Sequence, residues 1–219
     1  MNIIKPKAEI LTPDISKPEN IEAIYQKIEL AGRTCYKSED KIKKDSARKF
    51  VAALVKSGHE AMIEHAYMTV RFIIDRGISH ELVRHRLASF AQSSTRYCNF
   101  SHDKFGGEIT VIKPLFLEEG TEGYKTWLQA MIATENAYFK MLDIGYTPQE
   151  ARAVLPNSLM TEIVVTASMR EWRHIFKLRA AGTTGAPHPQ MVEVMLPLLK
   201  QCQKVMPELF GDIKVELYD

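Results

Sequence analysis

Apolar residues recur at helical spacing in two stretches near the start of the chain. The first stripe holds four apolar residues at positions i, i+3, i+4 and i+7: Ile21, Ile24, Tyr25 and Ile28. It predicts a helix that Gly32 is well placed to end. The second stripe consists of Phe50, Val51, Leu54 and Val55 and predicts a helix that ends at Gly58. Residues 33–44 are polar and rich in lysine, and we expect a solvated loop there.

Four further helices are predicted in the second half of the chain. A long stripe over 124–142 predicts a helix that ends near Gly145. Thr147, Pro148 and Glu150 form a typical helix start, and Pro156 must close that helix soon after. Two further amphipathic helices are predicted over 172–179 and 191–202.

Runs rich in β-branched and aromatic residues predict strands at 7–12, 66–75, 109–112, 163–166 and near 213–218. Gly77 ends the second strand, Ser79 caps a helix through about Leu87, and the hydroxyl-rich segment 89–94 is expected to be a loop. Strands and helices do not alternate regularly. We therefore expect an α+β fold, with residues 1–219 forming a single compact domain in which a mixed or antiparallel sheet packs against helices.

Composition is that of an ordinary globular protein. Of 219 residues, 45% are hydrophobic and 26% are charged, which argues against disordered and coiled-coil classes. The length suits one sizeable core. The formal net charge is only +2, so a surface that is basic throughout, as nucleic-acid binding would favour, is not expected. Any recognition of phosphate must be local.

The cysteines and histidines do not predict a disulfide framework or a metal site. Cys35, Cys98 and Cys202 are odd in number and lack C-x-x-C spacing. His59 and His65 are not at the i, i+4 spacing of a zinc-protease helix, so we predict no metal. The N-terminus lacks the apolar run of a signal peptide, and no stretch reaches the roughly 18 apolar residues of a membrane helix. We therefore expect a cytoplasmic protein that contacts no membrane.

Polar side chains are densest between Arg84 and Tyr97. This stretch contains three arginines, a histidine, a glutamine and four hydroxyl residues besides the tyrosine. Arginine can grip phosphate with two parallel hydrogen bonds, and neighbouring Ser and Thr residues can complete such a cradle. The stretch therefore indicates a site for a phosphorylated ligand. From chemistry alone, a solvated basic helix end followed by a hydroxyl-rich turn is an equally good interpretation.

The same stretch carries a specific motif. Arg84-His85-Arg86, a gap of seven residues, Ser94 and then Arg96-Tyr97 resemble the signature of the flavin-dependent thymidylate synthases. Three other segments are similar to blocks of that family: Gly58-His59-Glu60 with Glu64-His65, Ala151-Arg152-Ala153-Val154-Leu155-Pro156, and Arg170-Glu171-Trp172 through Arg179. The resemblance runs from about residue 58 to residue 179.

The resemblance implies roles for individual residues. Those expected to contact FAD are Ala61, Arg84, His85, Arg86, Gln92, Ser168, Met169, Arg170 and His174. Those expected to hold deoxyuridine monophosphate (dUMP) are Glu81, Leu82, Val83, Arg84, Gln92, Ser93, Ser94, Thr95, Arg96, Arg152 and Arg179. The expected catalytic residues are Arg179, Ser94 near the pyrimidine and His59 near the flavin.

Arg179 has the most specific expected role. The resemblance implies that it contacts the uracil and favours ionisation at N3, which a permanently charged guanidinium can do. From position alone, the better interpretation is an arginine that complements the dipole at a helix C-terminus. His65 has two equally good interpretations, a site residue or a satisfied structural histidine.

The reaction that the resemblance implies is the reductive methylation of dUMP to dTMP. The carbon comes from 5,10-methylenetetrahydrofolate, the hydride from FAD reduced by NADPH, and no covalent enzyme nucleophile or metal takes part. A homotetramer with active sites built from several subunits is also implied.

Two other hypotheses remain. One is a nucleic-acid-binding module that uses Arg84–Arg96, against which the near-neutral net charge argues. The other is a nucleotide sensor without catalysis. It would keep the phosphate cradle but lack flavin contacts, because Ala61, Ala91 and Ser168 stand where the family often has other residues. Gln92 and His174 also depart from the family's pattern.

Overall fold

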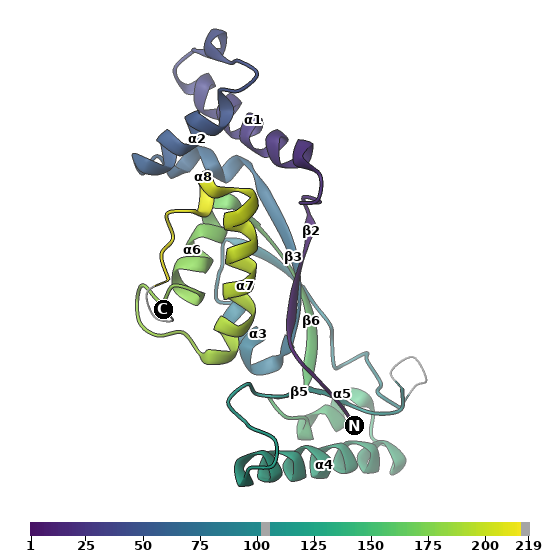
Figure 1. Cartoon of the computed structure of the whole chain (residues 1–219). Coiled ribbons are helices and arrows are strands. Elements are labelled where there is room, and N and C mark those ends of the chain that lie inside the picture. The colour runs from purple at the N-terminus through teal and green to yellow at the C-terminus, as the bar shows by residue number, and fades with distance from the viewer. Residues whose placement is uncertain (102–105, 216–219) are drawn as a thin grey trace. The chain divides into compact units, whose positions relative to one another are not determined.

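The computed structural model describes residues 1–101 and 106–215 (Figure 1). The chain forms two compact units, each assembled from segments that are far apart in sequence. Unit 1 consists of Met1–Lys7, Phe72–Arg84 and the described part of 91–163. Unit 2 consists of Ala8–Arg71, His85–Phe90 and residues 164–215.

Four strands form the main sheet, in the order β2 (Lys7–Thr12), β3 (Tyr67–Asp75), β6 (Met160–Ser168) and β4 (Ala88–Gln92). At one end, the N–H of Met169 donates to the carbonyl of Ala66 at 2.8 Å. At the other end, the N–H of Arg76 donates to the carbonyl of Leu159 at 3.1 Å. The start of β3 therefore lies beside the end of β6, and the two strands are antiparallel. Every second residue of β3 is buried, as a strand with one face on the core requires: Met68, Val70, Phe72 and Ile74.

Unit 1 contains the long helix α4 (Glu122–Asp143). Its shorter elements are β1 (Asn2–Ile4), β5 (Thr110–Ile112), α3 (Arg76–Leu82), α5 (Pro148–Ala151) and the 3-10 helix η4 (Arg152–Val154). Strands β1 and β5 are parallel, with Ile3 opposite Val111. The N-terminal ammonium lies 2.7 Å from the carboxylate of Glu108 and 3.2 Å from that of Glu135, which anchors β1. The core of this unit consists of Ile109, Val111, Met131, Tyr138, Ala151 and Leu159.

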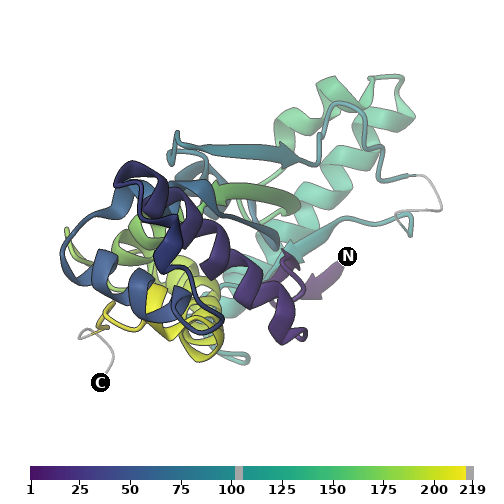
Figure 2. The same cartoon turned by 90° about the horizontal axis from the view of Figure 1, so that it is seen from above.

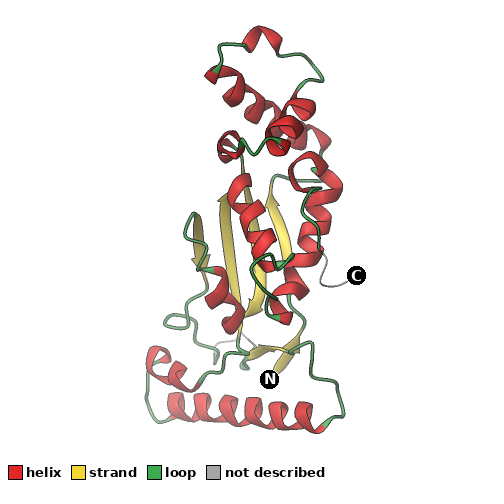
Figure 3. Cartoon of the chain, turned by 90° about the vertical axis from the view of Figure 1, so that its left-hand side faces the viewer, coloured by secondary structure: helices red, strands yellow, loops and turns green. Residues whose placement is uncertain are grey.

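Unit 2 contains most of the helices. They are α1 (Pro18–Cys35), η1 (Glu39–Lys41), α2 (Ala47–Lys56), η2 (Glu60–His65), α6 (Met169–Arg179), α7 (Pro189–Val205) and α8 (Pro207–Phe210). Helices α6 and α7 lie beside the strands of the sheet (Figure 3). The indole N–H of Trp172 on α6 donates to the carbonyl of Met68 on β3 at 2.8 Å. This bond satisfies a buried donor and fixes the helix against the sheet.

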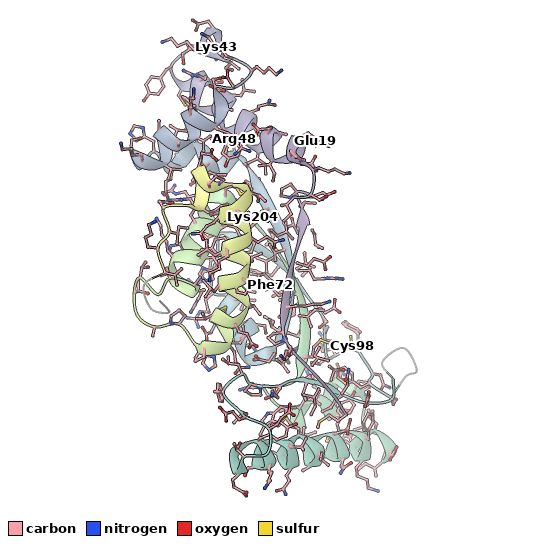
Figure 4. All side chains as sticks on the ribbon, viewed as in Figure 1. Glu19, Lys43, Arg48, Phe72, Cys98 and Lys204 are labelled. Atoms are coloured by element: carbon pink, nitrogen blue, oxygen red, sulfur yellow. The ribbon has the colours of Figure 1, made fainter. Side chains whose placement is uncertain are left out.

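Helices α1 and α2 pack side by side (Figure 2). Arg48 of α2, labelled in Figure 4, donates to the carboxylate of Glu22 on α1 at 2.5 Å and to that of Glu208 on α8 at 3.1 Å. One guanidinium therefore links three helices of unit 2.

The α+β class and most predicted elements are confirmed. Helices were correctly predicted where the apolar stripes are long, as in α4 and α7. The capping box at the start of α5 is present, since the N–H of Thr147 donates to Glu150 at 2.9 Å. Gly58 follows α2 with φ +73°, a conformation that suits glycine. Among the described residues, no helix combines the length and the apolar character needed to cross a membrane.

Gly32 does not end the first helix. Helix α1 continues to Cys35, and the 3-10 helix η1 interrupts the segment that was predicted to be a loop. A Cβ at position 32 would lie 2.5 Å from Cε1 of Phe50. The glycine therefore allows α1 and α2 to pack closely and does not end the helix.

Three other predictions of local structure are wrong. Helix α3 begins at Arg76 and ends at Leu82, because Asp75 rather than Ser79 caps it by accepting the N–H of Ile78 at 2.8 Å. Residues 88–92 form strand β4 instead of a loop, because they pair with β6, where Thr161 also accepts a hydrogen bond from Gln92. Residues 213–215 form no strand, and the rest of that predicted strand, 216–218, lies outside the described residues.

Candidate active site

The end of β4 is fixed by hydrogen bonds within unit 1. Nε2 of Gln92 donates to Oγ of Ser79 at 2.9 Å and to Oγ1 of Thr161 at 3.1 Å. The hydroxyls of Ser93 and Thr161 lie 2.9 Å apart, and the N–H of Ser93 donates to the carbonyl of Glu162 at 2.9 Å. These bonds hold Gln92 and Ser93 in one orientation at the start of the expected nucleotide-binding run.

The residues after β4 form a turn. The carbonyl of Ser94 accepts the N–H groups of Tyr97 at 3.2 Å and Cys98 at 3.0 Å. Buried Thr95 accepts a hydrogen bond from Nη1 of Arg152 at 3.3 Å. The turn therefore joins two segments of the expected dUMP site that are 57 residues apart in sequence.

The other residues expected near the nucleotide lie on α3 or directly after it. Glu81 is half-buried, whereas Val83 and Arg84 are exposed. The side chain of Leu82 is fully buried in the core, so Leu82 can meet a ligand only through its backbone. Arg96 is exposed, and its guanidinium lies 5.5 Å from the centre of the Tyr97 ring.

A buried histidine joins the expected catalytic arginine in unit 2. Nε of Arg179 donates to Nε2 of His85 at 3.2 Å. Nε2 must therefore carry a lone pair, which places the proton of the neutral imidazole on Nδ1. The ring of His174 stands edge-on to that of His85, with ring centroids 5.8 Å apart. The histidine fixes one edge of the Arg179 guanidinium.

The charge state of His85 follows from these surroundings. Burial lowers the pKa of His85 to about 4, and the nearby charges of Arg179 and His174 act in the same direction. Its Nδ1 lies 3.6 Å from Oε1 of Glu171, which is too long for a hydrogen bond. Burial also raises the pKa of the Glu171 carboxyl. His85 is therefore neutral near pH 7 and does not form an ion pair with Glu171.

Helix α6 presents the residues expected to contact the flavin. Oγ of Ser168 caps the helix by accepting the N–H of Glu171 at 3.2 Å. Met169 is buried, His174 is exposed, and Arg170 is exposed and paired with a glutamate of η2. Of the remaining residues expected in this unit, His59 precedes η2, Ala61 lies within it and Arg86 follows His85, and all three are exposed.

Apart from Arg179, which donates to His85, the arginines of the described chain fall into two groups. Arginines 33, 48, 71, 170 and 173 each pair with a carboxylate. Within residues 1–101 and 106–215, five others have no carboxylate within salt-bridge distance: Arg76, Arg84, Arg86, Arg96 and Arg152. Four of the five were predicted as site residues. Unpaired guanidiniums of this kind suit anionic ligands.

Two residues of these clusters were missed by the sequence analysis. Thr161 lies on β6 and organises Gln92 and Ser93, but an isolated threonine in a strand gives no signal in the sequence. Arg76 lies between the capping Asp75 and Gly77. The sequence pattern predicts the helix cap at Ser79, whereas the capping residue is Asp75, which directly precedes Arg76.

Comparisons with known proteins identify the family. A family model described as "Thymidylate synthase complementing protein" matches residues 20–208. The chain belongs to the flavin-dependent thymidylate synthase family. The Flavin-dependent thymidylate synthase of Corynebacterium glutamicum is 31% identical over 93% of this chain and 85% of its own length. The protein of the same name from Geobacter sulfurreducens is 33% identical over 84% of this chain and 80% of its own length.

A solved structure shares the fold. The UMP/dUMP methylase PolB from Streptomyces cacaoi, bound with 5-Br dUMP, superposes with a TM-score of 0.75 at 21% identity and covers 96% of both chains.

The family's flavin dependence implies FAD, and the side chains of unit 2 fit it. Arg86 is a cation without a carboxylate partner in the described chain, as a diphosphate requires. The exposed imidazole of His174 and the Ser168 hydroxyl can bond the polar edge of a flavin ring, whereas the His85 ring is buried and its Nε2 accepts from Arg179. No three His, Cys, Asp or Glu side chains of the described residues lie close enough together to hold a metal ion.

The expected sites divide between the units. All residues expected to bind dUMP except Arg179 belong to unit 1. All residues expected to bind FAD except Arg84 and Gln92 belong to unit 2.

Proposed function

We propose that this protein makes dTMP from dUMP by flavin-dependent reductive methylation. The observation that carries the proposal is the group of arginines without carboxylate partners in the described chain, on α3, around the Arg-His-Arg motif and on η4, in a member of this family. Two anionic ligands, FAD and dUMP, account for cations that no carboxylate neutralises.

Phosphate binding falls to unit 1. Arg152 is held by Thr95, and Arg96 follows the turn at Ser94, so guanidiniums and hydroxyls can surround the 5′-phosphate of dUMP. Ser94 would lie near the pyrimidine. Gln92, anchored by two hydroxyls, would orient the nucleotide beside the flavin.

Uracil activation falls to Arg179. Its guanidinium keeps its positive charge and stabilises negative charge that develops on the base when N3 ionises. Charge on the ring raises the nucleophilicity of C5, so no covalent enzyme nucleophile is needed. His85 positions Arg179 by accepting its Nε–H. A neutral His85 is essential here, because a protonated ring has no lone pair to accept that bond.

The atoms of the reaction balance with two co-substrates. The methylene of 5,10-methylenetetrahydrofolate goes to C5 of dUMP, and C5 loses its proton. FAD held by the residues of unit 2, once reduced by NADPH, would supply the hydride that turns the methylene into a methyl group. The folate therefore leaves as tetrahydrofolate. The residues of this chain orient the ligands and compensate their charges.

We also propose that residues 1–219 act as one domain in a homotetramer whose active sites are shared between subunits. Exposed apolar residues near the motif would suit contacts between subunits, since Leu87 is 80% and Tyr97 is 78% exposed. The three cysteines are free, which suits the reducing cytoplasm. Neither nucleic acid nor membrane is proposed as a partner.

The test is dTMP formation from labelled dUMP with methylenetetrahydrofolate and NADPH under low oxygen, with and without FAD. We expect product only with FAD. Arg179→Ala should lower the rate by roughly a hundredfold or more. Lys177→Ala, on the same helix, should leave the rate nearly unchanged. Absence of product from folded, tetrameric wild-type protein would contradict the proposal and favour a nucleotide sensor.

A further inference from the structure

Arg76 carries a buried nitrogen that no other group satisfies. Its Nη1 is inaccessible to solvent and has no hydrogen-bond partner among the described residues. Buried polar groups are almost always paired, because an unpaired one loses its hydration without compensation. A bound ligand with a hydrogen-bond acceptor could provide the partner that Nη1 lacks.

The backbone fixes where this arginine lies. The N–H of Arg76 donates to the carbonyls of Asn157 at 3.0 Å and Leu159 at 3.1 Å. The start of α3 is therefore tied to the segment that follows Arg152. The carboxylate of the preceding residue, Asp75, caps the helix by accepting the N–H of Ile78 at 2.8 Å.

The nearby charge is positive. Burial lowers the pKa of Arg76, and the charge of Arg152 lowers it further, so the two guanidiniums repel each other. Neither pairs with a carboxylate in the described part of the chain. Arg152 donates to the hydroxyl of Thr95 at 3.3 Å, a neutral group that leaves its charge uncompensated. An anion between Arg76 and Arg152 would relieve the repulsion and satisfy Nη1.

We infer that Arg76 binds the 5′-phosphate of the nucleotide substrate together with Arg152. The inference rests on the proposed function, since it takes dUMP as the ligand. It adds a residue that precedes the Arg84–Tyr97 motif. Within unit 1 this places a phosphate-binding arginine at the junction of β3 and α3, beside the pair formed by Thr95 and Arg152.

The test compares ligands with and without the phosphate. Binding of dUMP, deoxyuridine and FAD is measured by calorimetry on the purified oligomer for wild type, Arg76→Met and Arg76→Lys. We expect Arg76→Met to weaken dUMP binding roughly ten- to a hundredfold, as loss of a charged hydrogen bond does, and to change deoxyuridine and FAD binding less than about twofold. Arg76→Lys keeps the positive charge but lacks the second N–H of the guanidinium. Its affinity for dUMP should lie between those of wild type and Arg76→Met.

Stability provides a readout that a purely structural arginine would not share. Because the substitution removes an unpaired buried nitrogen and a repulsion, Arg76→Met without nucleotide should melt at or above the wild-type temperature. Arg71→Met is the control, since Arg71 lies on the preceding strand β3 and also has a buried nitrogen without a partner, Nε, but its guanidinium pairs with Glu9 at 2.6 Å. It should leave dUMP binding unchanged.

Three results would overturn the inference. Equal weakening of dUMP and deoxyuridine binding would show that Arg76 does not act on the phosphate. If Arg76→Met weakened only FAD binding, Arg76 would contact the diphosphate of FAD and not the phosphate of dUMP. A lower melting temperature with unchanged dUMP affinity would make Arg76 structural. If wild-type protein binds no dUMP at all, the proposed function itself fails, which is distinct from each of these results.

Discussion

The buried imidazole of His85 should make the stability of the fold depend on pH in a defined window. In the unfolded chain the ring takes up a proton near its ordinary pKa of about 6.5. In the folded chain burial lowers that pKa to about 4. Between these values the unfolded state binds a proton that the folded state does not, so stability falls as the pH falls from about 6.5 to about 4. Below about pH 4 His85 is protonated in both states, so it causes no further loss of stability.

The magnitude follows from the two pKa values. They differ by about 2.5, and each pKa unit corresponds to about 1.36 kcal/mol, so the complete loss is about 3 kcal/mol. Between pH 7 and pH 5 the linkage relation gives a loss of about 2 kcal/mol. The loss is large against the total stability of a typical domain, about 5–15 kcal/mol.

The assay is urea unfolding at pH 7 and pH 5, at one protein concentration, for wild type and His85→Gln. Glutamine stays neutral and its amide oxygen can still accept the Arg179 bond. We expect the variant to lose about 2 kcal/mol less than wild type between the two pH values. His65→Gln, at an exposed histidine, is the control and should behave as wild type does. Equal pH dependence in wild type and His85→Gln would refute a buried neutral His85.

Three further substitutions or reactions test the fold. Asp75→Ala removes the cap of α3 and should lower the free energy of unfolding by about 1–2 kcal/mol, with Asp75→Asn restoring part of it; denaturant titration decides, and an unchanged midpoint would disprove the cap. Cys202 is fully buried and burial raises its pKa to about 12, so a thiol reagent should label exposed Cys35 in the native protein and reach Cys202 only after unfolding; rapid native labelling of Cys202 would contradict its burial. Arg173→Met removes the guanidinium that pairs with Asp212, while Glu60 keeps Arg170 and Lys177 at 3.9 Å, and should cost about 2 kcal/mol in thermal or urea unfolding, whereas a loss below about 0.5 kcal/mol would show that this pair is weak.

Local patterns predicted the elements that depend on neighbours in sequence. The stripes of α4 and α7 and the capping box of α5 involve residues three or four positions apart, and these elements were predicted correctly. Strand β4 was missed because its pairing depends on Thr161, about seventy residues later. The end of α1 was predicted wrongly because Gly32 is required by its close packing against Phe50 on another helix.

The site shows the same division. The motif singles out Arg84 and His85, and a separate block singles out Arg152, because family resemblance is carried by linear segments; their roles in binding stay predictions. Neither the bond between His85 and Arg179, 94 residues apart, nor the unsatisfied nitrogen of Arg76 could be predicted. Both depend on burial and on long-range placement, which the sequence does not display.

The central claim, that reduced flavin rather than folate provides the reducing equivalents for thymidylate formation, is tested most directly by the folate product. The measurement follows dTMP and both reduced folates by mass spectrometry after anaerobic turnover with FAD and NADPH. Equal amounts of dTMP and tetrahydrofolate, both lost when FAD is omitted, are the predicted result. Dihydrofolate formed in step with dTMP in the absence of FAD would contradict the account.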